Sequence, residues 1–245
     1  MRVLVTRPRN EAEPLARRIE ALGFETVVEP LIDIRDVPDI SIDWSRIQAV
    51  VFTSANGVRA LAAGDKLPGD LPAFAVGLAT GMAARAAGFR KVIEGPGTVE
   101  GLAPLIVATC PPEAGSIVHV SGSAVARDLA ALLAASGLSV RRTIVYESVP
   151  ITQMGATLRE TLIRQAIDIA LFFSPRTART FVSLIRDAAL GENMKSVIAV
   201  ALSPAVAEIL KALPFSRIVT APRPTTEALL ESLANFNPSS SVRPS

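Results

Sequence analysis

Side chains that could bind a ligand occur in this sequence just after predicted buried strands. In residues 50–61, the apolar run Val50 to Phe52 is typical of a buried parallel strand, and Asn56-Gly57 turns the chain into a helix that starts near Val58. At such a junction, free backbone N–H groups and the helix dipole point beyond the end of the strand. The stretch therefore favours a site for carboxylates or phosphates. An ordinary loop capped by Ser54 is the simpler alternative for this stretch alone.

Hydroxyl side chains recur at the predicted strand ends, namely at Thr6, Ser54, Thr80, Ser121, Ser174 and Ser203. Taken one at a time, most of them are candidate helix N-caps, each worth about 1 kcal/mol of stability. Arranged around one cleft, they would instead suit a large ligand that carries several carboxylates and is held by backbone N–H groups.

The only tyrosine, Tyr146, lies in a long β-like run between the two halves of the chain. One interpretation is a half-buried aromatic side chain that packs on a hinge. The other is a phenol that donates a hydrogen bond or acts as a general acid in the cleft.

Common catalytic motifs are missing from the sequence. No G-x-G-x-x-G follows a strand and no G-x-x-x-x-G-K-[ST] occurs, which argues against dinucleotide and P-loop nucleotide binding. The chain has one cysteine, Cys110, and one histidine, His119, so an internal disulfide and a Cys/His metal cluster are excluded. His119 lies within a predicted strand, and we interpret it as a core histidine rather than a base.

Composition narrows the functional classes further. Hydrophobic residues make up 49% of the chain and aromatic residues 4%, which predicts a large core built from Ala, Val, Leu and Ile. A net charge of +2 and the lack of a basic run with interleaved aromatics argue against nucleic-acid binding. No apolar run approaches the ~20 residues of a membrane helix and no signal-peptide pattern is seen, so we expect a soluble, cytoplasmic protein that does not bind membranes.

Short apolar strands alternate with helical segments almost throughout, which predicts an α/β fold with parallel sheets covered by helices on both faces. The two halves also resemble each other. The stretch Val51 to Ser54 recurs as Leu171 to Ser174, and Ala75 to Leu78 recurs as Ala199 to Leu202, at an offset of about 120 residues. We therefore expect two similar domains whose strand ends face a shared cleft. From the residues alone, the domain boundary would fall near Pro111-Pro112.

The order and spacing of five short motifs resemble the uroporphyrinogen-III synthase family over essentially the whole chain. These motifs are Val5-Thr6-Arg7-Pro8, Phe52-Thr53-Ser54-Ala55-Asn56-Gly57-Val58, Val76-Gly77 followed by Thr80, Val145-Tyr146-Glu147, and Phe173-Ser174-Pro175. The resemblance implies two flavodoxin-like domains joined by a two-stranded β ribbon.

In that arrangement the first domain is discontinuous. The implied domains are residues 1–33 with 149–245, and residues 36–143; the ribbon strands lie near 31–35 and 143–148, and 237–245 is a disordered tail. We follow this division rather than a boundary near Pro111-Pro112.

The resemblance also implies a reaction. The family closes hydroxymethylbilane, a linear tetrapyrrole polycarboxylate, to uroporphyrinogen III, with inversion of ring D through a spiro intermediate and loss of water. It uses no cofactor or metal, and we expect a monomer. Because the substrate closes unaided to the symmetrical isomer, such a protein acts chiefly by orienting it.

The resemblance assigns roles residue by residue. Tyr146 would be the catalytic hydrogen-bond donor that helps hydroxide to leave, and Thr80 would contact the reacting end. Substrate contacts are implied at Thr6, Arg7, Ser54, Asn56, Gly57, Thr80, Ser121, Gly122, Ser174, Thr177 and Ser203. Two motifs depart from the family: Thr80-Gly81 stands where the family usually has Thr-Ala, and Ser203 would replace the second-half threonine at a shifted position.

Two other classes of function remain open on the residues alone. A non-catalytic two-lobed small-molecule binding module would share the architecture, but the absent signal sequence argues against the periplasmic type. A two-domain glycosyltransferase would need an acidic metal motif and a basic phosphate cluster, and neither is seen.

Overall fold

A computed structural model describes residues 1–64, 67–125 and 127–236. The tail predicted to be disordered, 237–245, lies outside the described residues. The chain forms two compact units: Met1–Asp33 with Val149–Ser245, and Ile34–Ser148. The boundary suggested by Pro111-Pro112 is wrong, because Pro112–Ala114 form a short 3-10 helix inside the second unit.

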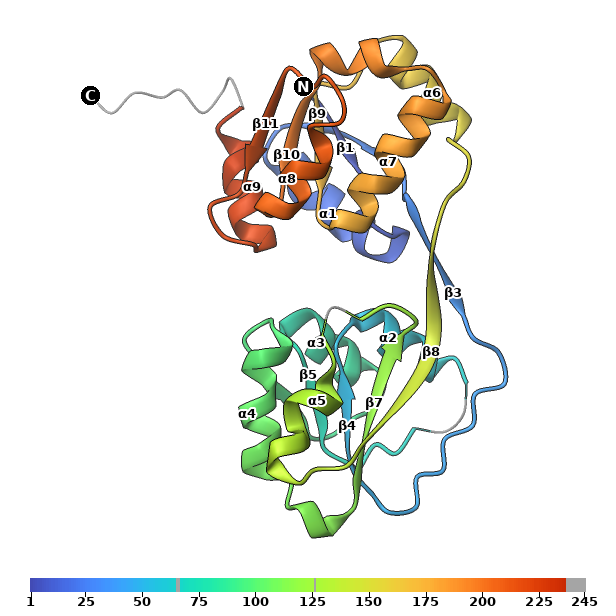
Figure 1. Ribbon diagram of the computed structural model, residues 1–245, viewed down its shortest axis with the longest axis vertical. Helices are drawn as coiled ribbons and strands as arrows, with labels where there is room; N and C mark the ends of the chain where they lie inside the picture. The colour runs from blue at the N-terminus through green and yellow to red at the C-terminus, as the bar shows by residue number, and fades with distance from the viewer. Residues whose placement is uncertain (65–66, 126, 237–245) are drawn as a thin grey trace, which may run out of the picture. The chain divides into compact units, whose positions relative to one another are not determined.

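The first unit has a five-stranded parallel sheet in the order β11-β10-β9-β1-β2 (Figure 1). Its strands are β1 (Arg2–Val5), β2 (Glu25–Val28), β9 (Ile169–Phe172), β10 (Ile198–Ala201) and β11 (Arg217–Thr220). Its helices are α1 (Arg9–Ala21), α6 (Ala156–Ile163), α7 (Pro175–Asp187), α8 (Pro204–Leu210) and α9 (Thr226–Ala234). Counted along this unit, the strand order is 2-1-3-4-5, which is that of flavodoxin.

Alternation along the strands divides the core of the first unit between two faces of the sheet. Leu4 packs in the cluster that contains α7 residues such as Phe181, whereas Val3 and Val5 pack in the cluster that contains Ile19 of α1. Successive strand side chains point to opposite faces, so both faces must be apolar and covered by helices. This accounts for the continuous apolar runs in the sequence.

The second unit has a six-stranded sheet in the order β3-β8-β7-β4-β5-β6. Its strands are β3 (Ile32–Asp36), β4 (Ile47–Phe52), β5 (Ala73–Ala75), β6 (Val92–Glu94), β7 (Ser116–Gly122) and β8 (Val140–Pro150). Its helices are α2 (Ala55–Ala62), α3 (Leu78–Ala86), α4 (Val99–Thr109) and α5 (Leu129–Leu133). All pairs from β8 to β6 are parallel.

The two sheets have the same spatial order once the repeat is taken into account. β6-β5-β4-β7-β8 corresponds to β11-β10-β9-β1-β2, and β4 and β5 carry the residues that recur in β9 and β10. The internal repeat of elements predicted from the sequence is therefore confirmed. The predicted match of Ala75 to Ala199 is wrong by two residues, because Ala75 lies opposite Phe52 and its counterpart opposite Phe172 is Ala201. The segment β7-α5-β8 corresponds to β1-α1-β2, but it ends the copy in the second unit whereas β1-α1-β2 begins the copy in the first. The two copies are therefore related by circular permutation.

Both unit boundaries fall inside paired strands, β3 and β8. The Val37 N–H donates to the Val145 carbonyl at 3.0 Å, and the Ile151 N–H donates to the Leu31 carbonyl at 3.1 Å. Residue numbers rise along one strand while those of the hydrogen-bonded partners fall along the other, so the two strands run antiparallel. Among the described residues, no helix is both long and apolar enough to cross a membrane.

Candidate active site

In a parallel α/β sheet, ligands bind at the carboxyl ends of strands, where the strand order reverses. This switch point lies between β1 and β9 in the first unit and between β4 and β7 in the second. The predicted site residues divide between the units. Thr6, Arg7, Ser174, Thr177 and Ser203 belong to the first, and Ser54, Asn56, Gly57, Thr80, Ser121, Gly122 and Tyr146 belong to the second.

Thr6 directly follows β1 and is fully buried. Its Oγ1 donates a hydrogen bond to the Leu171 carbonyl of β9 at 2.7 Å, so it joins the two strands at the switch point. Thr6 is not one of the helix N-caps, because Pro8 precedes the first residue of α1. Thr6 fixes the geometry of this strand end, and its hydroxyl is already used.

Ser174 caps α7, as the sequence predicts. Its Oγ accepts the Thr177 N–H at 3.1 Å and lies 2.9 Å from Thr177 Oγ1, and Pro175 occupies the first turn. A helix N-terminus of this length presents free N–H groups and a positive dipole end to an anion. The carboxyl end of β9 is therefore chemically suited to a carboxylate.

Arg7 lies next to this helix N-terminus. Its guanidinium carbon is 4.8 Å from the centre of the Phe173 ring, and it forms an ion pair with Glu11. The ring face and the carboxylate hold the cation in place at this strand end. Arg7 therefore adds positive charge to the switch point, although Glu11 offsets part of it.

In the second unit, Ser54 caps α2 by accepting the Asn56 N–H at 3.1 Å. Asn56 is buried, and its Oδ1 accepts a hydrogen bond from Arg59 at 2.7 Å. Gly57 lets the helix approach β7, because a methyl group there would lie 3.2 Å from the Val120 carbonyl oxygen. Asn56 and Gly57 thus have structural reasons for their identity beside the predicted substrate contacts.

The loop after β7 is held by Arg142, a residue that the sequence analysis missed. Its Nε donates to Ser121 Oγ at 2.9 Å, and its Nη2 donates to the Gly122 and Ser123 carbonyls at 2.7 and 2.9 Å. Ser121 is buried within β7 and is not one of the helix N-caps. The sequence carries no signal for this role, because Arg142 lies beside Arg141 in a strand with several polar residues and its partners are about 20 residues away.

Tyr146 lies at the same strand end. The β7–β8 register shifts between Ser121 and Gly122, which brings Gly122 opposite Tyr146. A methyl group at Gly122 would lie 2.6 Å from Cε2 and Cζ of the phenol ring, so only glycine leaves this space free. Tyr146 is 7% exposed and packs in the core that contains Phe52. Its ring therefore passes over Gly122, directly beside the Arg142-held loop.

His119, the residue of β7 that precedes Val120, is 2% exposed, and its Nε2 lies 3.1 Å from Thr53 Oγ1. Burial lowers its pKa to about 4; the charge of Arg142 adds to this, and Asp128 opposes it. The imidazole is therefore neutral near pH 7. The interpretation of His119 as a core histidine is confirmed.

Thr80 and Ser203 occupy different helix positions. Thr80 is the third residue of α3 and is buried; the N-cap of that helix is Gly77, so Thr80 is not a cap. Ser203 is the N-cap of α8, but its side chain makes no capping hydrogen bond. The equivalent of Ser203 in the other copy is thus Gly77 rather than Thr80.

Similarity to known proteins extends over most of the chain. A family model described as uroporphyrinogen-III synthase HemD matches residues 13–231. The chain belongs to the uroporphyrinogen-III synthase family. A protein named uroporphyrinogen-III synthase from Chlorobaculum parvum is 29% identical over 205 residues, which cover 79% of this chain and 82% of that protein.

Solved structures of uroporphyrinogen-III synthases share the fold. That from Helicobacter pylori is 20% identical with a TM-score of 0.61, covering 87% of this chain and 93% of that chain. A mutant from Thermus thermophilus is 22% identical with a TM-score of 0.51, covering 96% and 98%. These likenesses extend over both units of the chain.

The departure from the family at Gly81 has a local explanation. A methyl group at Gly81 would overlap the Glu94 carboxylate, which forms an ion pair with Arg85. Glycine at this position therefore makes room for Glu94 against α3. Within 1–64, 67–125 and 127–236, no three His, Cys, Asp or Glu side chains are grouped as metal ligands.

Proposed function

We propose that this chain closes hydroxymethylbilane to uroporphyrinogen III without a cofactor, inverting ring D through a spiro intermediate with loss of water. The observation that carries the proposal is the family match over residues 13–231. It is supported by helix N-termini and hydroxyl side chains at the switch point of each sheet.

In this proposal, the carboxyl ends of the strands bind the carboxylates of the substrate. The N-termini of α2 and α7 begin at Ser54 and Ser174, and each offers backbone N–H groups together with the positive end of the helix dipole. Neutral donors of this kind bind acetate and propionate groups without placing a strong opposing charge beside the reacting pyrroles. Thr6 and Arg7 support the strand end beside Ser174.

Tyr146 has the catalytic role in the proposal. Its phenol donates a hydrogen bond to the terminal hydroxyl of the bilane, and the hydroxyl leaves as water when that proton is transferred. The cation left behind is stabilised by the pyrrole nitrogen. Ring D then attacks through its substituted carbon. The position of Tyr146 over Gly122, beside a loop that Arg142 holds, supports this role because it fixes the phenol at a strand end.

Selectivity between isomers is a matter of orientation. The unaided reaction gives the symmetrical product, so the protein must make closure after ring inversion faster than direct closure. Each factor of ten in that preference needs about 1.4 kcal/mol of differential stabilisation. Several hydrogen bonds to carboxylates, each worth about 1.5–3 kcal/mol, supply differences of this size.

The experiment is to incubate the protein with hydroxymethylbilane and EDTA, and to separate the isomers. The expected product is mostly the type III isomer, whereas a product mixture equal to the buffer control would reject the enzyme. Exchange of Tyr146 for Phe should lower kcat strongly while circular dichroism and thermal unfolding stay nearly unchanged. An unchanged kcat would remove Tyr146 from the mechanism.

The proposal includes a monomer located in the cytoplasm. Light scattering after size-exclusion chromatography should give a mass near 25.8 kDa. A non-catalytic binding module is the competing outcome. It would bind the bilane or its product but leave the isomer ratio at that of buffer.

A further inference from the structure

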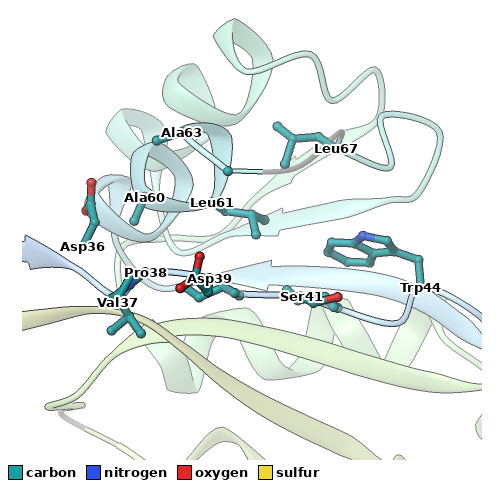
Figure 2. Close-up of a pocket in the computed structure, with 13 residues that line it drawn as sticks. Asp36, Val37, Pro38, Asp39, Ser41, Trp44, Ala60, Leu61, Ala63 and Leu67 are labelled. Atoms are coloured by element: carbon teal, nitrogen blue, oxygen red, sulfur yellow. The ribbon is translucent and has the colours of Figure 1, made fainter.

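A cavity of about 480 Å³ lies inside the second unit, away from the strand ends described above (Figure 2). One side is formed by the C-terminal end of α2 and the residues just after it, from Ala60 to Gly64. The other is formed by the end of β3 and the loop that follows it. Ser54, by contrast, caps the opposite end of α2. The volume is within the range of small-molecule sites.

The wall of the cavity is mainly apolar. Its apolar side chains are Val37, Pro38, Ile40, Ile42, Trp44, Leu61 and Leu67. Trp44 is the only tryptophan of the chain, and its ring lies along one side of the cavity in Figure 2. The face of an indole ring attracts both apolar groups and cations.

Two carboxylates, those of Asp36 and Asp39, line the same cavity. Both residues are exposed, and neither forms an ion pair with any lysine or arginine among the described residues. Asp39 also has a left-handed backbone, with φ at 53°, a conformation that few non-glycine residues adopt. Backbone conformations of this kind cluster at ligand sites.

The charge of the cavity selects against the substrate of the family. A tetrapyrrole polycarboxylate would bring further negative charge next to Asp36 and Asp39, and like charges at close range repel. An occupant complementary to the cavity has a positive head for the carboxylates and an apolar body for Trp44 and the aliphatic wall.

We propose that this cavity binds a small organic cation: an amine or guanidinium on an aliphatic or aromatic body. The head group lies at Asp36 and Asp39, and the body packs on Trp44, Ile42 and Leu61. The site is separate from the strand ends to which we assign the tetrapyrrole. Its occupant is therefore a second ligand of the protein rather than a part of the substrate.

The single tryptophan makes the test direct, because the intrinsic indole fluorescence reports on Trp44 alone. The probe is 3-phenylpropylamine, and the matched control is 3-phenylpropionate, which has the same apolar body and the opposite charge. The amine should change the fluorescence saturably, with a dissociation constant at least tenfold lower than that of the carboxylate. No saturable change, or an equal response to both compounds, would overturn the proposal.

Variants separate the charge effect from simple apolar binding. The double exchange Asp36→Asn and Asp39→Asn should abolish the preference for the amine, whereas Asp43→Asn, in the same loop but outside the cavity, should keep it. A double variant that still prefers the amine tenfold would refute the role of the two carboxylates. The double variant should also leave the isomer ratio of the tetrapyrrole product unchanged, so this test stands independently of the proposed enzyme activity.

Discussion

Acid should destabilise this protein through one buried side chain, His119. Its pKa is lowered from 6.5 to about 4 in the folded state by burial and by the charge of Arg142. Below pH 6.5 the unfolded chain therefore binds a proton that the folded protein refuses. The free energy of unfolding should fall by about 1.4 kcal/mol per pH unit, and by about 3 kcal/mol in total between pH 6.5 and 4. Above pH 6.5 both states are neutral at this residue, and its contribution does not change.

Two measurements test this reasoning. Because the chain has one histidine, the NMR signal of the imidazole can be followed without assignment, and its midpoint gives the pKa. Urea unfolding from pH 4 to 7.5 gives the stability, and the same series on His119→Gln removes the contribution of the carboxylates that titrate over the same range. The wild type should lose about 3 kcal/mol more than the variant.

Exchanges of Arg142 and Arg141 provide a matched pair of variants for this test. Exchange of Arg142 for Gln removes a charge that lowers the pKa of His119, so that pKa should rise while burial keeps it below 6.5. Exchange of Arg141, whose guanidinium donates to the Asp43 carbonyl instead, should leave it unchanged. An imidazole that titrates near 6.5 in the folded wild type would refute the account of this buried site.

Three further predictions concern stability at the strand ends. Gly122→Ala should lower the free energy of unfolding by about 1–3 kcal/mol and should lower kcat, because the added methyl group displaces the Tyr146 ring. The control Gly191→Ala has open space around it and should change the free energy of unfolding in urea by less than about 0.5 kcal/mol. Equal effects of the two exchanges would contradict the packing of Tyr146. Ser174→Ala should cost about 1 kcal/mol through the lost cap of α7. Ser203→Ala should lower the free energy of unfolding by only a few tenths of a kcal/mol, since its side chain makes no capping hydrogen bond. A larger loss of stability in thermal unfolding would show that the Ser203 hydroxyl does stabilise α8.

Local patterns predicted the strand–turn–helix units well. The apolar run ending at Phe52 and the cap at Ser54 occur as the spacing indicates. The turn predicted at Asn56-Gly57 is wrong, because the helix begins directly after the cap and includes both residues. The repeat was visible where the copies follow the same chain order, from β4 and β5 to β9 and β10. Circular permutation places β7 late in its copy and β1 at the start of the other, so a comparison at constant offset does not detect their equivalence.

Side-chain partners far apart in sequence could not be predicted. Thr6 belongs to a set of residues of which most were candidate helix caps, but its hydroxyl donates to a carbonyl 165 residues away in the adjacent strand. The role of Arg142 was not predicted from the sequence, because it depends on the parallel pairing that brings β8 beside β7. The apolar cavity of the second unit was missed for the same reason, since a loop and the end of α2 meet there only in the fold.

The most direct test of the proposed function is to supply hydroxymethylbilane with a ¹³C label in ring D and to read the product by NMR. The proposed function predicts that the label appears in a ring whose acetate and propionate groups have exchanged order relative to the other three. A labelled ring that keeps its original order, as in the product formed in buffer alone, would contradict it.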